Sequence, residues 1–159
     1  MLAAPHMLAG AAIGKLSRRC WLAVIAAFAS HFLLDIIPHL DSHGLFGVKG
    51  GGPTRGEAVS AVVDTVVGVA FVLAFVARQP GRRRMIAAAF AAVVLDLLDN
   101  VPPWGQWFDA WKGTAWLSLF HHSIQHNVPR AQWPLGFATQ LAVVALAAWV
   151  LLARRERKG

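Results

Sequence analysis

One stretch decides the interpretation of this chain: Ser30-His31-Phe32-Leu33-Leu34-Asp35-Ile36-Ile37-Pro38-His39. His31, Asp35 and His39 follow one another at four-residue intervals, so a helix would present all three on one face. Imidazole and carboxylate groups are costly inside a hydrophobic segment and are usually retained there for a function. The stretch therefore predicts a helix that holds metal-ligand chemistry in apolar surroundings.

The composition predicts an integral membrane protein. Hydrophobic residues make up 57% of the 159 residues and charged residues only 14%, which is far from the balance of a soluble domain. Several long apolar runs leave no room for a separate soluble domain, so we expect one all-α domain over 1–159, a helical bundle in the membrane. No basic cluster precedes the first apolar run, and we expect no cleaved signal peptide.

Charge and cysteine content narrow the possible partners. The formal net charge is +7, but the basic residues stand in short clusters at the ends of apolar runs, where they act as topology signals. We therefore expect a membrane and lipid partner and no nucleic acid. Cys20 is the single cysteine, which excludes an intrachain disulfide and a thiolate-rich zinc site. Any metal must take nitrogen and oxygen ligands.

Apolar length and turn residues predict four to five transmembrane helices. The first is short for a full crossing, and its Gly10 and Gly14 have the spacing that lets another helix approach closely. Turns are expected at Gly50-Gly51-Gly52-Pro53 and at Gln79-Pro80-Gly81. The glycine run lacks the Gly-Lys-Ser/Thr ending of a phosphate-binding loop, so we interpret it as a turn. The predicted spans lie near residues 3–16, 20–40, 57–78, 84–101 and 134–153, with a loop over 102–133.

The basic clusters predict the orientation of these spans. One alternating topology turns every cluster toward the cytoplasm and the loops at 41–56 and 102–133 outward. In the second loop, Trp104, Trp107 and Trp111 have helical spacing and predict a helix at the membrane interface, as an anchor rather than a substrate cage. The clusters are Lys15, Arg18 and Arg19, then Arg78, Arg82, Arg83 and Arg84, then Arg154, Arg155, Arg157 and Lys158, whereas the outer loops hold only Lys49, Arg55, Lys112 and Arg130.

Acidic and histidine residues gather on the outer side of this topology. Only Glu156 falls on the cytoplasmic side, and loop residues such as Asp41, His43 and Asp109 need no function because solvent can surround them. The others are candidates for a site. We predict Asp99 and His126 as catalytic proton donors or acceptors, and the following metal ligands: His6, His31, Asp35, His39, Asp64, Asp96, His121 and His122.

This ligand set suits a divalent cation. Imidazole with carboxylate binds zinc, manganese or iron, and the cation offsets buried carboxylates that would otherwise be costly. Zinc is the favoured ion. The number of ligands suggests two ions about 3.5–4 Å apart, an arrangement used in phosphoester and peptide hydrolysis.

Structural roles are the alternatives for the same residues. A buried hydrogen bond between His31 and Asp35 would hold helices together without any metal. Asp64 would pair with Arg55 or with a histidine, and Asp99, which precedes two prolines, would mark a helix exit. Which of the histidines at 121, 122 and 126 is a ligand stays open.

Three short motifs resemble a known family. They are Ala4-Pro5-His6-Met7-Leu8-Ala9-Gly10, Leu34-Asp35-Ile36-Ile37-Pro38-His39-Leu40-Asp41 and His121-His122-Ser123, and they resemble the YdjM-like bacterial inner-membrane metal-dependent hydrolases. The resemblance implies a small helical inner-membrane protein whose metal site is related in pattern to zinc-dependent phospholipase C. The chain lacks the family's His-Arg-Gly step before the second histidine and the N-terminal Trp of the soluble phospholipases. The resemblance implies site residues at His6, Asp35, His39 or Asp41, and His122.

Together these features predict a metal-dependent hydrolase that opens to the outer face of the cytoplasmic membrane. A lipid phosphoester is the expected substrate, because a site just below the interface can receive a headgroup while the acyl chains stay in lipid. The main alternative is a proton or divalent-cation transporter in which Asp and His form a relay. A relay should reach both sides of the membrane, however, and the inner halves of the spans are apolar. A membrane adaptor, the third class, would bind no metal.

Overall fold

The computed structural model describes residues 1–46, 54–100 and 104–153, and within them the chain is helical, with one isolated parallel bridge between His39 and Asn127. The predicted turn at Gly50-Gly51-Gly52-Pro53, Lys49 and the last cluster with Glu156 lie outside the described residues, as do the side chains of Trp104 and Asp109. The helices are α1 (Ala3–Leu16), α2 (Cys20–Ile36), α3 (Ser42–Phe46), α4 (Arg55–Val76), α5 (Arg82–Ala91), α6 (Val94–Asn100), α7 (Trp104–Ala110), α8 (Ala115–Ile124), the 3-10 helix η1 (Arg130–Gln132) and α9 (Trp133–Leu152).

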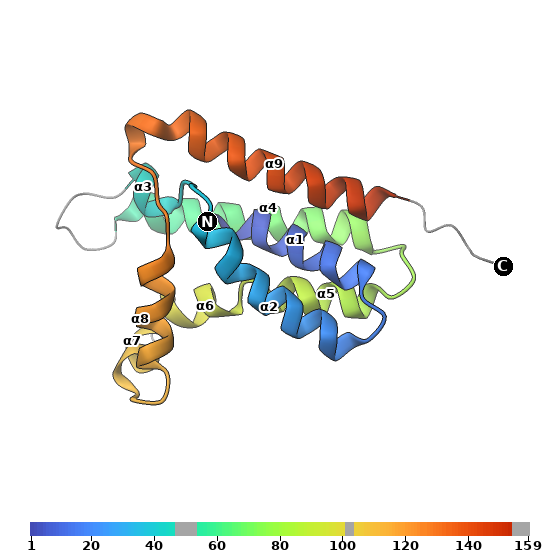
Figure 1. Cartoon of the computed structure of the whole chain (residues 1–159). Helices are drawn as coiled ribbons and strands as arrows, with labels where there is room; N and C mark the ends of the chain where they lie inside the picture. The colour runs from blue at the N-terminus through green and yellow to red at the C-terminus, as the bar shows by residue number, and fades with distance from the viewer. Residues whose placement is uncertain (47–53, 101–103, 154–159) are drawn as a thin grey trace.

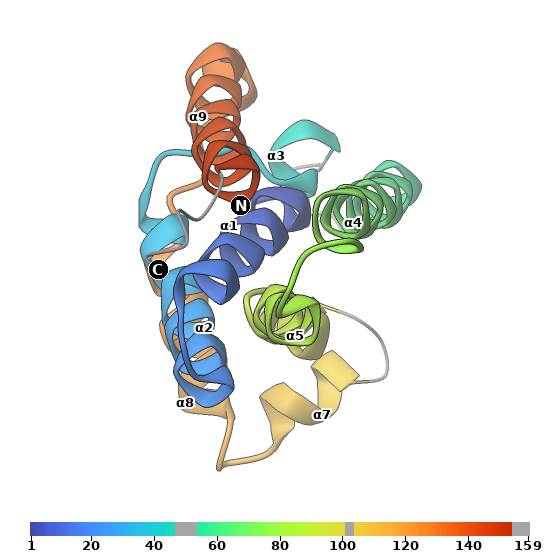
Figure 2. The same cartoon turned by 90° about the vertical axis from the view of Figure 1, so that its right-hand side faces the viewer.

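Helix α1 lies in the middle of the bundle and packs against α2, α4, α5 and α9 (Figure 2). Its 14 residues span about 21 Å, less than the hydrocarbon thickness of a bilayer. The expected close approach at its glycines is confirmed. A Cβ on Gly10 would lie 2.6 Å from the carbonyl oxygen of Ala88, and one on Gly14 would lie 2.6 Å from Cα of Met85. Helices α1 and α5 therefore touch backbone to backbone.

Two segments are long and apolar enough to cross a membrane, α4 and the continuous stretch Arg130–Leu152 that includes α9. Both lie along α1 (Figure 1). Only 17% of the most apolar window of α4 and 22% of that of the second segment is buried within the bundle, so most of their Val, Leu and Phe side chains face outward. Helix α2 is apolar too, but shorter.

Two predicted spans differ in the structure. Helix α2 ends at Ile36 instead of continuing to residue 40, because Pro38 has no N–H and disfavours helical geometry in the residue before it. The predicted span at 84–101 consists of α5 and α6, with a turn at Ala92 and Val93 between them. This interruption frees the Ala92 carbonyl group from helix pairing.

The predicted outer loop contains two helices, α7 and α8, and α8 runs across the direction of α4 and α9 (Figure 1). The Trp107, Trp111 and Trp116 side chains are all exposed. Trp107 lies in α7 and Trp116 in α8, but the helix predicted through Trp111 ends at Ala110, before it. Exposed tryptophans of this kind are typical of a segment at the membrane interface.

Basic side chains close the end of the bundle opposite α8. Lys15 Nζ donates to the carbonyl oxygens of Leu151 and Ala153, and Arg84 Nε donates to the carbonyl oxygen of Gly14. Both cations thus pair with carbonyl groups near helix C-termini, where positive charge is favourable. They belong to the clusters that the sequence predicts on one side of the membrane.

Candidate metal centre

Three helices and the segment after α2 bring imidazole and carboxylate side chains together at one end of the bundle. His6 comes from the second turn of α1, and His31 and Asp35 come from consecutive turns of α2. His39 follows the end of α2, and His121 comes from α8. Backbone hydrogen bonds join the segment after α8 to the C-terminal end of α2. The N–H of His126 donates to the carbonyl oxygen of Asp35, and the N–H of Val128 donates to the carbonyl oxygen of His39.

Asp35 is the centre of this cluster. Its Oδ2 lies 3.2 Å from Nε2 of His31 and 3.2 Å from Nε2 of His121. Its Oδ1 lies 3.2 Å from Nε2 of His6 and 3.9 Å from Nε2 of His39. All five side chains have 0% exposure. One carboxylate is thus surrounded by four buried imidazoles, two near each oxygen.

Hydrogen bonds at Nδ1 orient three of these rings. His31 Nδ1 donates to the freed carbonyl oxygen of Ala92 at 2.8 Å, and His39 Nδ1 donates to that of Ile37 at 2.7 Å. His121 Nδ1 donates to Asp99 Oδ2 at 2.9 Å. Because a carbonyl or carboxylate oxygen accepts, Nδ1 carries the proton in each ring and Nε2 faces Asp35. Metal-binding histidines are held by this type of outer hydrogen bond.

The Nε2 atoms of His31 and His121 lie 3.0 Å apart. Two neutral rings protonated at Nδ1 would bring lone pairs together at that distance, so a proton or a cation must lie between them. Burial alone would lower the pKa of His121, but its hydrogen bonds to Asp35 and Asp99 outweigh burial and raise the pKa to about 9. Without a metal, His121 carries the proton at neutral pH.

The donor set fits a divalent cation. The nitrogen and oxygen atoms of His31, Asp35 and His121 lie within 4.8 Å of one another, and so do those of His6, His31 and Asp96. Ligands at about 2.0–2.1 Å from a tetrahedral zinc ion are roughly 3.3 Å apart, close to the 3.0 and 3.2 Å separations around Asp35 Oδ2. Nδ1 of His6 is buried without a hydrogen-bond partner, which leaves it available for a ligand.

Asp96 forms the open edge of the cluster. Its Oδ1 lies 3.7 Å from Nε2 of His31 and 3.6 Å from Nε2 of His121, and its side chain is 22% exposed. His122 is 52% exposed, and its Nε2 lies 3.1 Å from Asp99 Oδ2. Solvent therefore reaches the cluster from the side of α6 and α8.

Asp99 and His122 lie behind His121 rather than beside Asp35. Asp99 Oδ1 accepts from Ser118 Oγ at 2.7 Å, and its Oδ2 faces both His121 and His122. In this arrangement Asp99 orients His121, and His122 contacts Asp99 and stacks on the His121 ring with the ring centroids 5.5 Å apart.

Three other candidate residues lie outside the cluster. Asp64 accepts hydrogen bonds from the N–H groups of Ala3 and Ala4 at the start of α1. The His126 side chain is exposed, although its backbone pairs with Asp35 and His39. Asp41 accepts from the N–H of Gly44 in α3.

The structure adds groups that the sequence interpretation missed. The amino nitrogen of Met1 lies 2.6 Å from Asp35 Oδ1 and 2.8 Å from His39 Nε2. The Gln125 side-chain nitrogen lies 3.0 Å from Nε2 of His121, one helical turn away in sequence. Gln140 Oε1 accepts from the N–H of Leu2. A polar residue inside the apolar stretch 134–153 was the available signal for Gln140.

Comparisons with protein-family models, with curated proteins and with solved structures each gave no match. The resemblance to the YdjM-like hydrolases stays a prediction from the sequence motifs.

Proposed function

We propose that this chain is a membrane-embedded metal-dependent hydrolase that acts on a lipid phosphoester. One observation carries the proposal: His6, His31, His39 and His121 converge on Asp35, all of them buried, with Nε2 directed at the carboxylate. A buried carboxylate needs compensating positive charge: the Met1 amino group lies 2.6 Å from Oδ1, and a metal ion would supply that charge beside Oδ2 in place of the proton on His121. The hydrogen bonds at Nδ1 of three of these rings are of the type that orients metal-binding histidines.

His31, Asp35 and His121 would hold the ion, with Asp96 as the ligand at the open edge. A bound divalent cation supplies a Lewis acid for a phosphoryl oxygen and lowers the pKa of water. Zinc suits these nitrogen and oxygen ligands best. Asp35 Oδ1 faces His6 and His39, but the Met1 amino group contacts both Oδ1 and His39, so a second ion held there would have to displace it.

Other residues orient ligands and move protons. Asp99 fixes the tautomer of His121 through Nδ1. His122 contacts Asp99 and is half-exposed, so it can exchange a proton between the cluster and solvent. The chemistry we infer is hydrolysis, with water arriving past Asp96.

We place this site on the outer side of the bacterial inner membrane in a bundle of four to five spans. The positive-inside pattern supports this orientation, and the resemblance to the YdjM-like hydrolases supports the compartment and the reaction class. Within the described residues, the buried histidine and aspartate side chains gather at the end of the bundle away from Lys15 and Arg84. A one-sided site favours an enzyme over a proton or cation relay.

The first experiment measures metal in detergent-purified protein by elemental analysis. Wild-type protein should retain zinc or a similar ion, and His31→Ala and Asp35→Ala should lose most of it with helix content unchanged. Asp64→Asn is the matched control, because this carboxylate binds backbone N–H groups and its variant should keep the metal. A folded wild-type protein that binds no divalent metal would end the hydrolase proposal in favour of an adaptor.

The second experiment separates enzyme from transporter. Metal-loaded protein in liposomes should release phosphate or headgroup from a lipid phosphoester, and His121→Ala should abolish this turnover. The same liposomes should show no metal-dependent proton or cation flux. Flux that is lost in His31→Ala, without any hydrolysis, would establish the transporter instead.

A further inference from the structure

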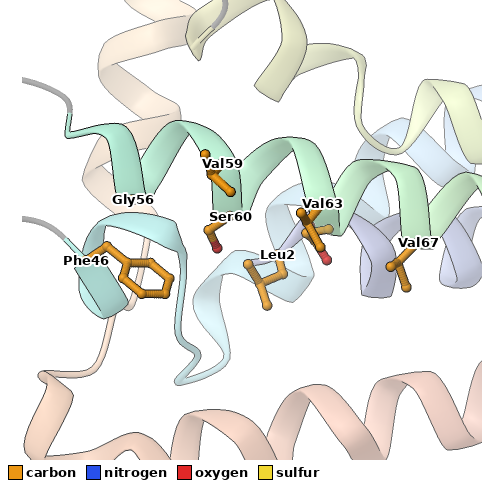
Figure 3. A pocket seen from close by; sticks show the side chains of 8 residues that line it. Leu2, Phe46, Gly56, Val59, Ser60, Val63 and Val67 are labelled. Atoms are coloured by element: carbon orange, nitrogen blue, oxygen red, sulfur yellow. The ribbon is translucent and has the colours of Figure 1, made fainter.

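Two apolar grooves meet at Leu2, next to the metal centre. The α4 groove has a volume of about 460 Å³ and is lined by Leu2, Phe46, Val59, Val63, Asp64 and Val67 (Figure 3). The α9 groove has a volume of about 450 Å³ and is lined by Leu2, Leu40, Leu45, Arg130, Phe137 and Gln140. Leu2 therefore belongs to both walls.

Two polar side chains of these grooves, Asp64 and Gln140, are engaged by backbone N–H groups near Leu2. Asp64 binds the N–H groups of Ala3 and Ala4, and Gln140 binds the N–H of Leu2. What remains of the α4 groove is aliphatic and aromatic apart from Ser60, whose hydroxyl accepts a hydrogen bond from Ser42, as Figure 3 shows for Phe46, Val59, Val63 and Val67. A ligand of this groove must be apolar.

The position of the grooves indicates hydrocarbon rather than protein. They open along α4 and α9, the two helices that are long and apolar enough to cross a membrane and that bury little of their surface in the bundle. Two grooves of nearly equal volume match the two chains of one lipid.

Both grooves end beside the metal centre. Leu40, in the α9 groove, follows His39 in the chain, and the backbone nitrogen of Met1, next to Leu2, contacts Asp35 and His39. Arg130 adds a basic side chain to the α9 groove, and a guanidinium group is suited to a phosphate. Chains on either side of Leu2 would bring the polar end of the lipid to the cluster.

We infer that the two grooves bind the two acyl chains of a glycerophospholipid that carries an anionic phosphate, with Leu2 between the chains and Arg130 near the phosphate. This inference rests on the proposed function and names its substrate class. Lipid reaches the centre from the side of α4 and α9, whereas water reaches it from the side of α6 and α8, past Asp96.

The test uses full-length protein in phosphatidylcholine nanodiscs that contain a phosphatidate analogue with a diazirine in one acyl chain. After irradiation, mass spectrometry locates the labelled residues. Val59, Val63 and Phe137 should be labelled several-fold more than Val66 and Leu141, which are also exposed apolar residues of α4 and α9 but line neither groove. Equal labelling of all these positions would overturn the inference.

Three variants test the apolar and the anionic parts of the inference separately. Val63→Trp fills the α4 groove and should reduce labelling there several-fold, whereas Val66→Trp should leave it unchanged. Arg130→Gln should reduce labelling of Phe137 by the phosphatidate analogue and not by a phosphatidylcholine analogue with the same chain. If Arg130→Gln affects neither analogue, the anionic part of the inference is wrong.

Elemental analysis of the same samples keeps the two proposals apart. If the grooves are labelled in a protein that holds no metal, the lipid site is supported and the hydrolase proposal is wrong. If the protein holds metal but all positions are labelled equally, the metal centre is supported and these grooves are not its substrate site.

Discussion

Asp99 Oδ2 accepts a hydrogen bond from Nδ1 of His121 at 2.9 Å, on the side of the ring away from Asp35. A carboxylate in this position fixes the tautomer of a metal-binding imidazole and increases the basicity of its other nitrogen. Asp99 therefore influences the cluster through His121, as a positioning residue.

Asp99→Asn should weaken metal binding about 10- to 100-fold, the usual cost of losing such an outer partner. Ser118 Oγ still has an oxygen to bind, so the fold should persist. Competition with a chelator of known affinity measures the effect. His126→Ala, whose side chain is exposed, is the control and should bind as wild type, and an unchanged affinity in Asp99→Asn would argue against this role.

Metal affinity should increase with pH up to about 9. The pKa of metal-free His121 is raised to about 9 because its hydrogen bonds to Asp35 and Asp99 outweigh burial. Below that pH the metal must displace a proton from Nε2, so affinity falls as pH falls. Titrations between pH 6.5 and 9 should show this slope, and His121→Gln should bind more weakly with a smaller slope. A pH-independent affinity in wild-type protein would contradict the prediction.

Gly10→Leu should destabilise the bundle, since even a Cβ at this position would lie 2.6 Å from the Ala88 carbonyl oxygen. Overpacking of this kind costs about 1–3 kcal/mol, which corresponds to a decrease of roughly 2–12 °C in the thermal midpoint. Circular dichroism in detergent measures it. Ala70→Leu, at an exposed position of α4, should unfold at the wild-type temperature. Equal midpoints for both variants would mean that α1 and α5 are not packed this closely.

The proposed orientation can be checked by cysteine labelling in a Cys20→Ser background. Lys112→Cys should react with an impermeant maleimide added to intact cells, whereas Arg82→Cys should react only after the membrane is permeabilised. The reason is the positive-inside placement of the Arg82 cluster. The reverse pattern would move the metal centre to the cytoplasmic face.

Much of the helical framework can be predicted from the sequence. Helix α1 matches its predicted bounds, and α4 and α9 lie within two residues of theirs, because long apolar runs between turn residues leave few alternatives. The turn at Ala92 and Val93 could not be predicted. Its neighbours are Ala, Val and Leu without Gly or Pro, so the local sequence has no helix-breaking signal, and the His31 ring that binds the freed carbonyl comes from another helix.

The candidate site, too, could be predicted only in part from the sequence. Four-residue spacing correctly indicates that His31 and Asp35 share a face of α2, and they are both buried in the cluster. Spacing cannot say which helix that face meets. Asp64 is a polar residue in an apolar run just as Asp35 is, yet it binds the start of α1. Consecutive His121 and His122 differ in burial because neighbouring residues of a helix point in different directions.

The contributions of α1, α2, α6 and α8 to one cluster have a consequence for biogenesis. His6 can meet Asp35 of α2 early in synthesis, whereas His121 can join Asp35 only after α8 has been made. Contacts between such distant parts of a chain form late in folding. If the cluster binds metal as proposed, acquisition of the ion follows synthesis of α8, and a ribosome-bound chain arrested before α8 should be unable to acquire it.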